Sequence, residues 1–376
     1  MNILIAPDSF KGSLSAKQFC DIADKAIKSV LPNASVIKRP LADGGEGTVE
    51  ALVLNTNGRI FYKTVYGPMG KKTKAHFGIL GDCKTAIIEM ASASGLPLVA
   101  LSERNPMIAT TYGTGELVLE ALELGCTKMI LGIGGSATND GGAGMMQALG
   151  FKLLDNDGQE IEKGAKGLLN LAEINIDERD KRLDEVEFVV ACDVDNPLCG
   201  LNGAARVYGF QKGANEEMVL VMDEALKQFD RIIQKDLNKN ILNMEGAGAA
   251  GGLGAGMMAF LDADLRPGFE IINEAINLEQ VFKENKIDLV ITGEGEINYQ
   301  TINGKLPVQV AKLAKKYNAK VIAVVGTIGE GADKVYEKGI DSIISIVDQP
   351  MSLDYALVNS ERLLFSAIER LVRILK

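Results

Sequence analysis

Acidic side chains follow several of the apolar runs that we expect to form strands. Ligands of open α/β sheets bind at the carboxyl ends of the strands, so acids in these places are candidates for a site. Converging carboxylates need a cation between them, which favours Mg²⁺ bound to substrate phosphates, and one carboxylate can accept the proton of a substrate hydroxyl. For most of them we expect a helix cap or a turn instead. The eight acids are Asp8, Asp43, Glu46, Asp140, Asp193, Asp195, Glu294 and Glu296.

Four glycine clusters accompany these acids, at residues 43–47, 132–144, 246–256 and 293–295. Three of them directly follow expected strands, where glycine lets a ligand approach the backbone amides. The second cluster leads into a helix, so its amides and hydroxyls are expected to hold phosphate. Lys11 and Lys212 each precede a glycine and are expected to neutralise charge on a substrate. The expected phosphate donors of the second cluster are Gly134, Gly135, Ser136, Thr138, Asn139 and Gly141.

The composition excludes several kinds of site and partner. The chain of 376 residues has one histidine, His76, so metal sites that need several imidazoles are excluded, and His76 is expected to be structural. The P-loop pattern GxxxxGK[ST] does not occur in the sequence. Forty basic and fifty acidic side chains give a net charge of −10, which argues against nucleic acid and anionic membranes as partners.

The cysteines and the N-terminal segment indicate a compartment. The five cysteines have no CxxC spacing and are expected to be reduced thiols in a cytoplasmic protein. The N-terminal apolar run lacks a basic segment before it, so we interpret it as a strand and not as a signal peptide. Every apolar run is shorter than the ~18 residues that span a membrane.

Both ends of the chain alternate strands and helices. A strand at residues 2–6 precedes a helix with a capping box of Ser15 and Gln18, and a strand at 35–41 follows, so the two strands should be parallel. The last third repeats this order with strands at 288–292, 320–325 and 342–347, helices at 306–317 and 333–338, and a closing amphipathic helix. The middle begins with an antiparallel ribbon at 59–90 and has further strands at 128–133 and 187–192.

These elements predict an α/β fold of two domains with the active site in the cleft between them. Residues 1–58 and 285–376 are expected to form a discontinuous flavodoxin-like or Rossmann-like domain around a parallel sheet. Residues 59–284 are expected to form an inserted mixed α/β domain that carries the glycine-rich phosphate loops.

Several longer motifs resemble the bacterial glycerate kinases (the glycerate 2-kinase family, type I), and the resemblance covers essentially the whole chain. The motifs lie at residues 6–14, 40–48, 134–142, 192–198 and 248–254. The resemblance implies a two-domain α/β enzyme that uses ATP and Mg²⁺. It implies transfer of the γ-phosphoryl group to D-glycerate, most often to the 2-hydroxyl. The sequence leaves open whether the protein forms a homodimer.

The expected site combines these motifs. Asp195 is the expected general base with Asp193 assisting, because both follow a strand and precede a turn with proline that would hold them rigidly. Lys11 is expected to act on the transferred group, while Asp43 and Glu46 are the expected Mg²⁺ ligands. Gly251 and Gly252 complete the expected nucleotide-binding set. The expected substrate contacts are Ser9, Phe10, Asp43, Gly44, Lys212 and Glu294.

One motif departs from the family pattern, and three alternative functions remain open for the protein. After Gly295 the family usually has Arg, an apolar residue and Asp, whereas this chain has Glu296, Ile297 and Asn298, which lowers the local charge by about one unit. This change keeps a non-catalytic glycerate or nucleotide sensor open. The product could also be 3-phosphoglycerate. A GxGxxG match at 246–251 suggests an NAD(P)-dependent reductase, but a polar helical stretch precedes it, so we expect a packed turn and helix start there.

Overall fold

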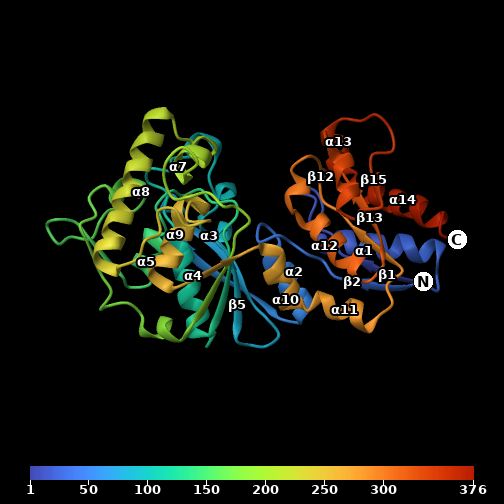
Figure 1. Cartoon of the computed structure of the whole chain (residues 1–376), viewed down its shortest axis with the longest axis horizontal. Helices are drawn as coiled ribbons and strands as arrows, with labels where there is room; N and C mark the ends of the chain where they lie inside the picture. Colours follow the sequence, from blue (N-terminus) through green and yellow to red (C-terminus); the bar gives the residue numbers. More distant parts are fainter. The chain divides into compact units, whose positions relative to one another are not determined.

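The structure is a computed structural model that describes residues 1–376, with Asn303 described by its backbone alone. Contacts between residues divide the chain into two compact units. Unit 1 comprises Met1–Asp43 and Phe269–Lys376, and unit 2 comprises Gly44–Gly268 (Figure 1). The fold is α/β, as predicted, and both ends of the chain contribute to unit 1.

The unit boundaries differ from the expected positions after residues 58 and 284. Helix α2 (Thr48–Thr56) packs on strands of unit 2, so the boundary falls before it. Helix α11 (Leu278–Glu284) belongs to unit 1, because Phe282 stacks on Tyr317 at 5.3 Å and the Tyr317 hydroxyl donates to Glu279 Oε1 at 2.8 Å. Tertiary packing of short helices, and not chain composition, sets these boundaries.

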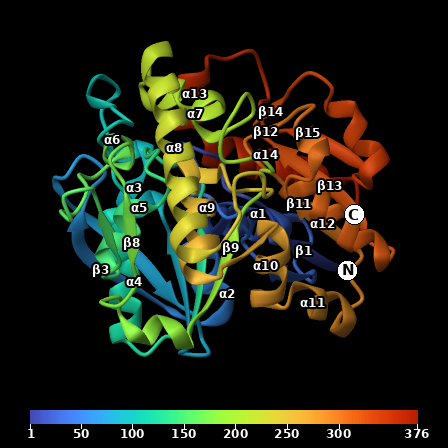
Figure 2. The ribbon, with the colours of Figure 1, turned by 60° about the vertical axis from the view of Figure 1, so that its left-hand side comes forward.

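Unit 1 contains a five-stranded sheet in the order β15-β13-β11-β1-β2, and every neighbouring pair is parallel. Figure 2 shows β1, β11 and β13 side by side. Its central strands are apolar and buried, as expected for a sheet covered on both faces. The strands are β1 (Asn2–Ile5), β2 (Ser35–Lys38), β11 (Leu289–Thr292), β13 (Lys320–Val325) and β15 (Ser342–Ser345).

The expected closing helix is divided in two at Asn359, which ends one helix and precedes the next. A two-stranded pair, β12 (Glu296–Ile297) and β14 (Thr327–Ile328), was not predicted. The helices are α1 (Ala16–Val30), α10 (Gly268–Ile276), α11, α12 (Leu306–Lys316), α13 (Leu353–Val358) and α14 (Ser360–Arg373), and the 3₁₀ turns are η5 (Thr301–Asn303) and η6 (Ala332–Lys338).

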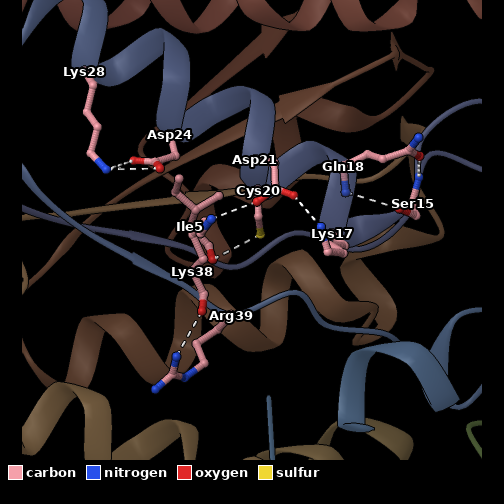
Figure 3. Close-up of polar contacts among 10 residues, drawn as sticks. All are labelled: Ile5, Ser15, Lys17, Gln18, Cys20, Asp21, Asp24, Lys28, Lys38 and Arg39. Carbon is pink, nitrogen blue, oxygen red and sulfur yellow. Dashed lines mark hydrogen bonds and ion pairs between the residues drawn. The ribbon is translucent and has the colours of Figure 1, made fainter. Parts of the chain in front are cut away.

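Helix α1 illustrates how local sequence determines an element (Figure 3). The predicted capping box is present: Gln18 N donates to Ser15 Oγ at 3.1 Å, and Ser15 N donates to Gln18 Oε1 at 2.8 Å. Asp21 pairs with Lys17 at 2.6 Å within the helix and with Lys38 of β2 at 2.7 Å, which lowers the pKa of its carboxyl. The opposite face of α1 enters the core of unit 1, so capping and burial favour the same helix.

Unit 2 contains a six-stranded mixed sheet in the order β10-β9-β6-β5-β4-β3. Strands β3 to β5 are antiparallel, as the alternation in the sequence predicts, and the rest are parallel. The strands are β3 (Arg59–Tyr66), β4 (Lys72–Ile79), β5 (Thr85–Glu89), β6 (Lys128–Gly132), β9 (Glu187–Ala191) and β10 (Asp264–Arg266), with a separate antiparallel pair of β7 (Lys152–Leu154) and β8 (Glu173–Asn175).

Buried residues of unit 2 form several clusters, among them one against the sheet with α4 and one in which α8 contacts α9. The helices are α2, α3 (Ala91–Ser94), α4 (Tyr112–Glu123), α5 (Ala143–Ala148), α6 (Ala165–Leu168), α7 (Ala204–Tyr208), α8 (Glu216–Leu237) and α9 (Ala249–Leu261), and the 3₁₀ turns are η1 (Leu96–Leu98), η2 (Leu101–Glu103), η3 (Lys181–Glu185) and η4 (Phe210–Lys212). Each helix in the described part of the chain falls short of the length and apolarity that a bilayer crossing needs. The five cysteines are free thiols.

Candidate functional site

An exposed glycine turn follows β6 in unit 2. Gly134 and Gly135 are exposed to solvent, and Gly135 adopts a left-handed conformation with a φ of 73°. The N–H groups of Gly134, Gly135 and Ser136 donate none of the hydrogen bonds found among the described residues. Successive free amides in a turn of this kind form a concave surface that binds anions. The turn therefore has free amides of the kind that bind anions, and phosphate binding there stays a prediction.

A buried lysine lies directly beneath this turn. The Lys212 side chain is 2% exposed, and its Nζ donates to Ser136 Oγ at 2.9 Å and to the Thr138 carbonyl at 2.7 Å. Burial lowers the pKa of Lys212 to about 7, although the nearby Asp140 opposes this shift. A lysine side chain buried in this way favours its neutral amine form unless an anion lies beside it. Lys212 is therefore a cation that a bound phosphate would stabilise.

Asp140 fixes the segment that connects the turn to the start of α5. Its buried carboxylate accepts from Thr111 N and Oγ1 at 2.8 and 2.9 Å, and from the amides of Gly142 and Gly144 at 3.2 and 3.3 Å. Burial raises the pKa of Asp140 and these hydrogen bonds oppose the rise. The Gly141 amide donates to Gly251 O at 3.0 Å. The donor expected at Gly141 is thus bonded within the protein, because Asp140 and α9 take up the start of α5.

Thr138 and Asn139, also expected to contact phosphate, are fully buried. Among the described residues, Thr138 Oγ1 and both amide atoms of Asn139 have no hydrogen-bond partner. Gly251 and Gly252 cover them from α9, whose backbone is left-handed from Ala250 to Gly252. In this structure these four residues support the turn from inside instead of presenting donors to solvent.

Gly251→Ala should destabilise unit 2 strongly. A Cβ at this position would lie 2.1 Å from the Thr138 carbonyl oxygen, and φ is already +73°. Clash and strain together should lower the free energy of unfolding by at least about 3 kcal/mol. Gly158→Ala is the matched control, since Gly158 has the same φ with open space around it, and it should cost only about 1 kcal/mol. Urea unfolding of both variants gives the comparison, and equal losses would contradict this packing.

The Gly44–Gly47 loop lies against the same edge of the unit 2 sheet. A Cβ on Gly44 would lie 2.7 Å from Ala191 Cβ, and one on Gly132 would lie 2.3 Å from Gly44 O. Gly45 passes close to Gly134. The ends of β6 and β9 therefore carry this loop beside the phosphate-accepting turn, and the Glu46 side chain in it is exposed.

Asp193 and Asp195 follow β9 and have exposed side chains. Asp193 Oδ1 accepts from the Gly268 amide, the first residue of α10, at 2.9 Å. The Asn196 side chain accepts from the Tyr208 hydroxyl at 2.7 Å, and the charge of Asp195 contributes to a raised pKa of Tyr208. Asp193 is thus engaged with the Gly268 amide, whereas Asp195 stays a candidate base on an exposed turn.

Three carboxyl groups interact in unit 1, around the ends of β1 and β11. Burial raises the pKa of Asp8, and the negative charges of Asp43 and Glu294 raise it further, against a hydrogen bond from Ser9 N at 2.6 Å. Glu294 is 8% exposed and accepts from Thr301 Oγ1 at 2.9 Å. A buried carboxyl with a raised pKa suits proton transfer, so Asp8 is a candidate base that the sequence placed among the acids but did not single out.

Basic and apolar residues surround this cluster. Lys305 Nζ lies 3.8 Å from Glu294 Oε2, and the exposed Lys11 lowers the pKa of Asp8 by its charge. Phe10 is buried with its ring 5.5 Å from that of Phe19, so it supports the core, while Ser9 is half-buried. Lys11 and Lys305 are suited to an anionic substrate, and Phe10 acts through packing.

Comparison with known proteins decides the family. The profile of the Glycerate kinase family matches residues 3–376. The chain belongs to the glycerate kinase family. It is 51% identical over 356 residues to a glycerate kinase of Bacillus subtilis (strain 168) and 49% identical over 356 residues to the glycerate 2-kinase of Escherichia coli (strain K12), covering 95% of this chain and 93% of the relative in both cases.

A solved structure gives the same result. A crystal structure from Salmonella typhimurium LT2, of a protein proposed to be glycerate kinase 2, matches with a TM-score of 0.89 and 46% identity. The match covers 100% of this chain and 98% of that chain. The resemblance seen in the motifs and the two-domain α/β fold class are therefore confirmed, and the chain is an enzyme of the kinase class.

The departure from the family pattern forms a local contact. Asn298 Nδ2 donates to Glu296 Oε1 at 3.1 Å, and Asn298 Oδ1 accepts from Gln300 N at 2.9 Å. Glu296 and Asn298, the two residues that depart from the pattern, thus bond to each other at the exposed start of a turn. The chain has an amide–carboxylate pair at the positions where the resemblance led us to expect an arginine and an aspartate.

The carboxylates fit a metal that is shared with a ligand. No group of three or more His, Cys, Asp and Glu side chains in the described part of the chain could hold a metal ion alone. Mg²⁺ commonly takes only one or two carboxylates and completes its shell with water and substrate phosphates. Asp43 and Glu46 each carry a carboxylate, and their role as Mg²⁺ ligands stays a prediction.

A cavity of about 590 Å³ in unit 2 lies elsewhere, beside β10 and the end of α9. Ile241, Met258 and Leu265 line it, and it shares no residue with the phosphate-accepting turn. This cavity and the turn are therefore separate features of unit 2.

Proposed function

We propose that this protein transfers the γ-phosphoryl group of ATP to the 2-hydroxyl of D-glycerate and releases 2-phosphoglycerate. The observation that carries the proposal is the exposed Gly134–Ser136 turn, with three free amides above the buried Lys212. The relatives named as glycerate kinases, one of them as a glycerate 2-kinase, support glycerate as the substrate.

The turn and Lys212 have the properties that phosphoryl transfer needs. This reaction depends on positioning and on stabilising the charge of the transferred group. The amides of Gly134, Gly135 and Ser136 would hold phosphate oxygens, and Lys212 would add a positive charge that water does not screen. A bound phosphate restores the protonated state of Lys212, since it opposes the burial that lowers its pKa.

The carboxyl cluster of unit 1 supplies the groups that an alcohol substrate needs. Asp8 would accept the proton of the attacking hydroxyl, and Asp195 is the second candidate for this step. Lys11 and Lys305 would attract the carboxylate of glycerate. Asp43 and Glu46 would contribute to holding Mg²⁺, which when bound neutralises charge on the phosphate oxygens.

A steady-state assay tests the proposal against its alternatives. With Mg-ATP and D-glycerate, ADP should form at a rate that saturates with glycerate and falls to background without it. Calorimetry with D-glycerate and NADH should show binding of glycerate alone. Glycerate binding without ADP formation would favour a sensor, and saturable NADH binding would favour a reductase. The polar helical and turn segment before residue 246 argues against the reductase.

A further inference from the structure

The carboxylate of Glu89 lies at the start of α2, far from its own position in the sequence. Glu89 is the last residue of β5 and is 5% exposed. Its Oε1 accepts from Val49 N at 2.8 Å, and the neighbouring Thr48 N, whose hydrogen bond at 3.4 Å goes to Gly45 O, lies near the same carboxylate. These are the first two amides of α2, which have no acceptor within the helix.

Helix α2 has no cap of its own that could do this. The residue before the helix is Gly47, which has no side chain and adopts a left-handed conformation with a φ of 92°. In most helices a Ser, Thr, Asp or Asn at this position accepts from the free amides. Glu89 takes that role from the sheet, so β5 and the start of α2 are joined through one buried carboxylate.

The Gly44–Gly47 loop is held at both ends as a result. At its first end Gly44 packs against Ala191 and Gly132, where no side chain would fit. At its second end Glu89 fixes Val49, and the preceding Thr48 bonds back to the loop, because its N and Oγ1 both donate to Gly45 O, at 3.4 and 2.8 Å. Gly45 in turn lies beside Gly134 of the phosphate-accepting turn. A displacement of Thr48 would thus move the loop relative to that turn.

Stability alone does not account for an acid at this position. Burial raises the pKa of Glu89 to about 7, with a further rise from the charge of Glu50 and opposition from His76 and from the two amides. Between pH 4.5 and about 7, Glu89 is therefore protonated in the folded protein but ionised in the unfolded chain. Stability must fall as the pH rises through this range, so ionised Glu89 works against folding.

We propose that Glu89 is a positioning residue for the phosphoryl-transfer site, which fixes the Gly44–Gly47 loop beside the Gly134–Ser136 turn by accepting from Val49 N at the start of α2. The proposal rests on the proposed function for its kinetic consequence. Its structural consequence, an ordered loop, is independent of that function.

Three substitutions separate the roles of acceptor and charge. Glu89→Ala removes the acceptor, Glu89→Gln keeps it without charge, and Glu89→Asp keeps the charge but draws it back by one methylene. Glu50→Ala is the matched control, since Glu50 is an exposed acid in the same first turn and pairs with His76 at 3.4 Å. Glu50 does not accept from Val49 N, which bonds to Glu89.

Hydrogen exchange and steady-state kinetics give the readouts. Glu89→Ala and Glu89→Asp should accelerate amide exchange in residues 44–49 at least about tenfold, with the rest of unit 2 unchanged. They should lower kcat/KM about 10- to 100-fold, mostly in kcat, because misplacement of about 1 Å has such an effect. Glu89→Gln should recover most of both losses, and Glu50→Ala should match the wild type.

Two results would overturn the proposal. One is unchanged exchange in residues 44–49 of Glu89→Ala, and the other is faster exchange with unchanged kcat/KM. If Glu89→Ala does not fold, Glu89→Asp and Glu89→Gln provide the same comparison. A wild-type protein without glycerate kinase activity would refute the proposed function, while the exchange experiment would still test whether Glu89 orders the loop.

Discussion

Lys212→Met should lower kcat by about 100- to 1,000-fold without unfolding the protein, which is the usual effect of removing one preorganised electrostatic group. The lysine is buried and bonded to Ser136 and Thr138, so its charge acts on a bound phosphate with little screening by water. Methionine has a similar length and shape but no charge. Steady-state kinetics at saturating ATP and glycerate gives the ratio.

The same substitution should change how stability depends on pH. Burial lowers the pKa of Lys212 from 10.5 to about 7, so between these values the unfolded chain binds a proton that the folded protein does not. The free energy of unfolding of the wild type therefore gains a rising contribution from about pH 7 to 10.5, and Lys212→Met loses it. Urea unfolding at pH 7 and 9.5 measures the difference.

An exposed lysine provides the control for both measurements. Lys166 lies on the surface and pairs with Glu162 at 3.7 Å. Lys166→Met should leave kcat and the pH dependence of stability unchanged. A Lys212→Met protein that is folded and turns over at the wild-type rate would remove Lys212 from the phosphate-binding site.

Asp8→Asn should lower kcat/KM by about 100- to 10,000-fold, the range that a general base contributes. The reason is that the amide cannot accept the hydroxyl proton. The acidic side of the pH–rate profile should also disappear, since protonation of Asp8 no longer limits the reaction. Activity measured from pH 5 to 9 in the wild type and the variant tests both statements.

Asp8→Asn should stabilise the protein above neutral pH. Burial and the charge of Asp43 raise the pKa of Asp8 from 3.8, so the folded protein loses stability as the pH rises from that value through the raised pKa. An amide has no charge to bury. A gain in thermal stability at pH 8 with a loss of activity would therefore be the signature of a functional buried acid.

Asp195→Asn is the matched comparison, because Asp195 is the base that the sequence favours. Its side chain is exposed, so this substitution should hardly affect stability. If Asp8 is the base, Asp195→Asn should keep most of the wild-type kcat/KM. A large loss in Asp195→Asn with normal activity in Asp8→Asn would reverse the assignment.

Elements with strong local signals could be predicted from the sequence. The capping box of Ser15 and Gln18 and the apolar spacing after it indicated α1, and α1 begins at Ala16 with both cap hydrogen bonds. Alternating residues indicated the antiparallel ribbon that became β3 and β4. In each case the residues that give the signal lie within a few positions of one another or repeat at a regular spacing along the chain.

The inner structure of the candidate site could not be predicted in this way. Glu89 lies 40 positions from Val49, and Thr111 lies 29 positions from Asp140, so neither contact leaves a local pattern. The sequence predicts a phosphate loop at the glycines after β6. Which of their amides stay free depends on α9, because Gly251 bonds to Gly141 and covers Thr138. Long-range packing therefore decides which donors a motif presents.

Phosphorus NMR of a reaction with Mg-ATP and D-glycerate tests the central claim most directly. We expect the γ-phosphorus resonance of ATP to be replaced by those of ADP and a single phosphate monoester, whose phosphorus couples to the one proton on C2 of 2-phosphoglycerate. Lys212→Met should form the same product far more slowly. A monoester coupled to the two protons of C3, or no ADP above background while D-glycerate still binds, would contradict the account.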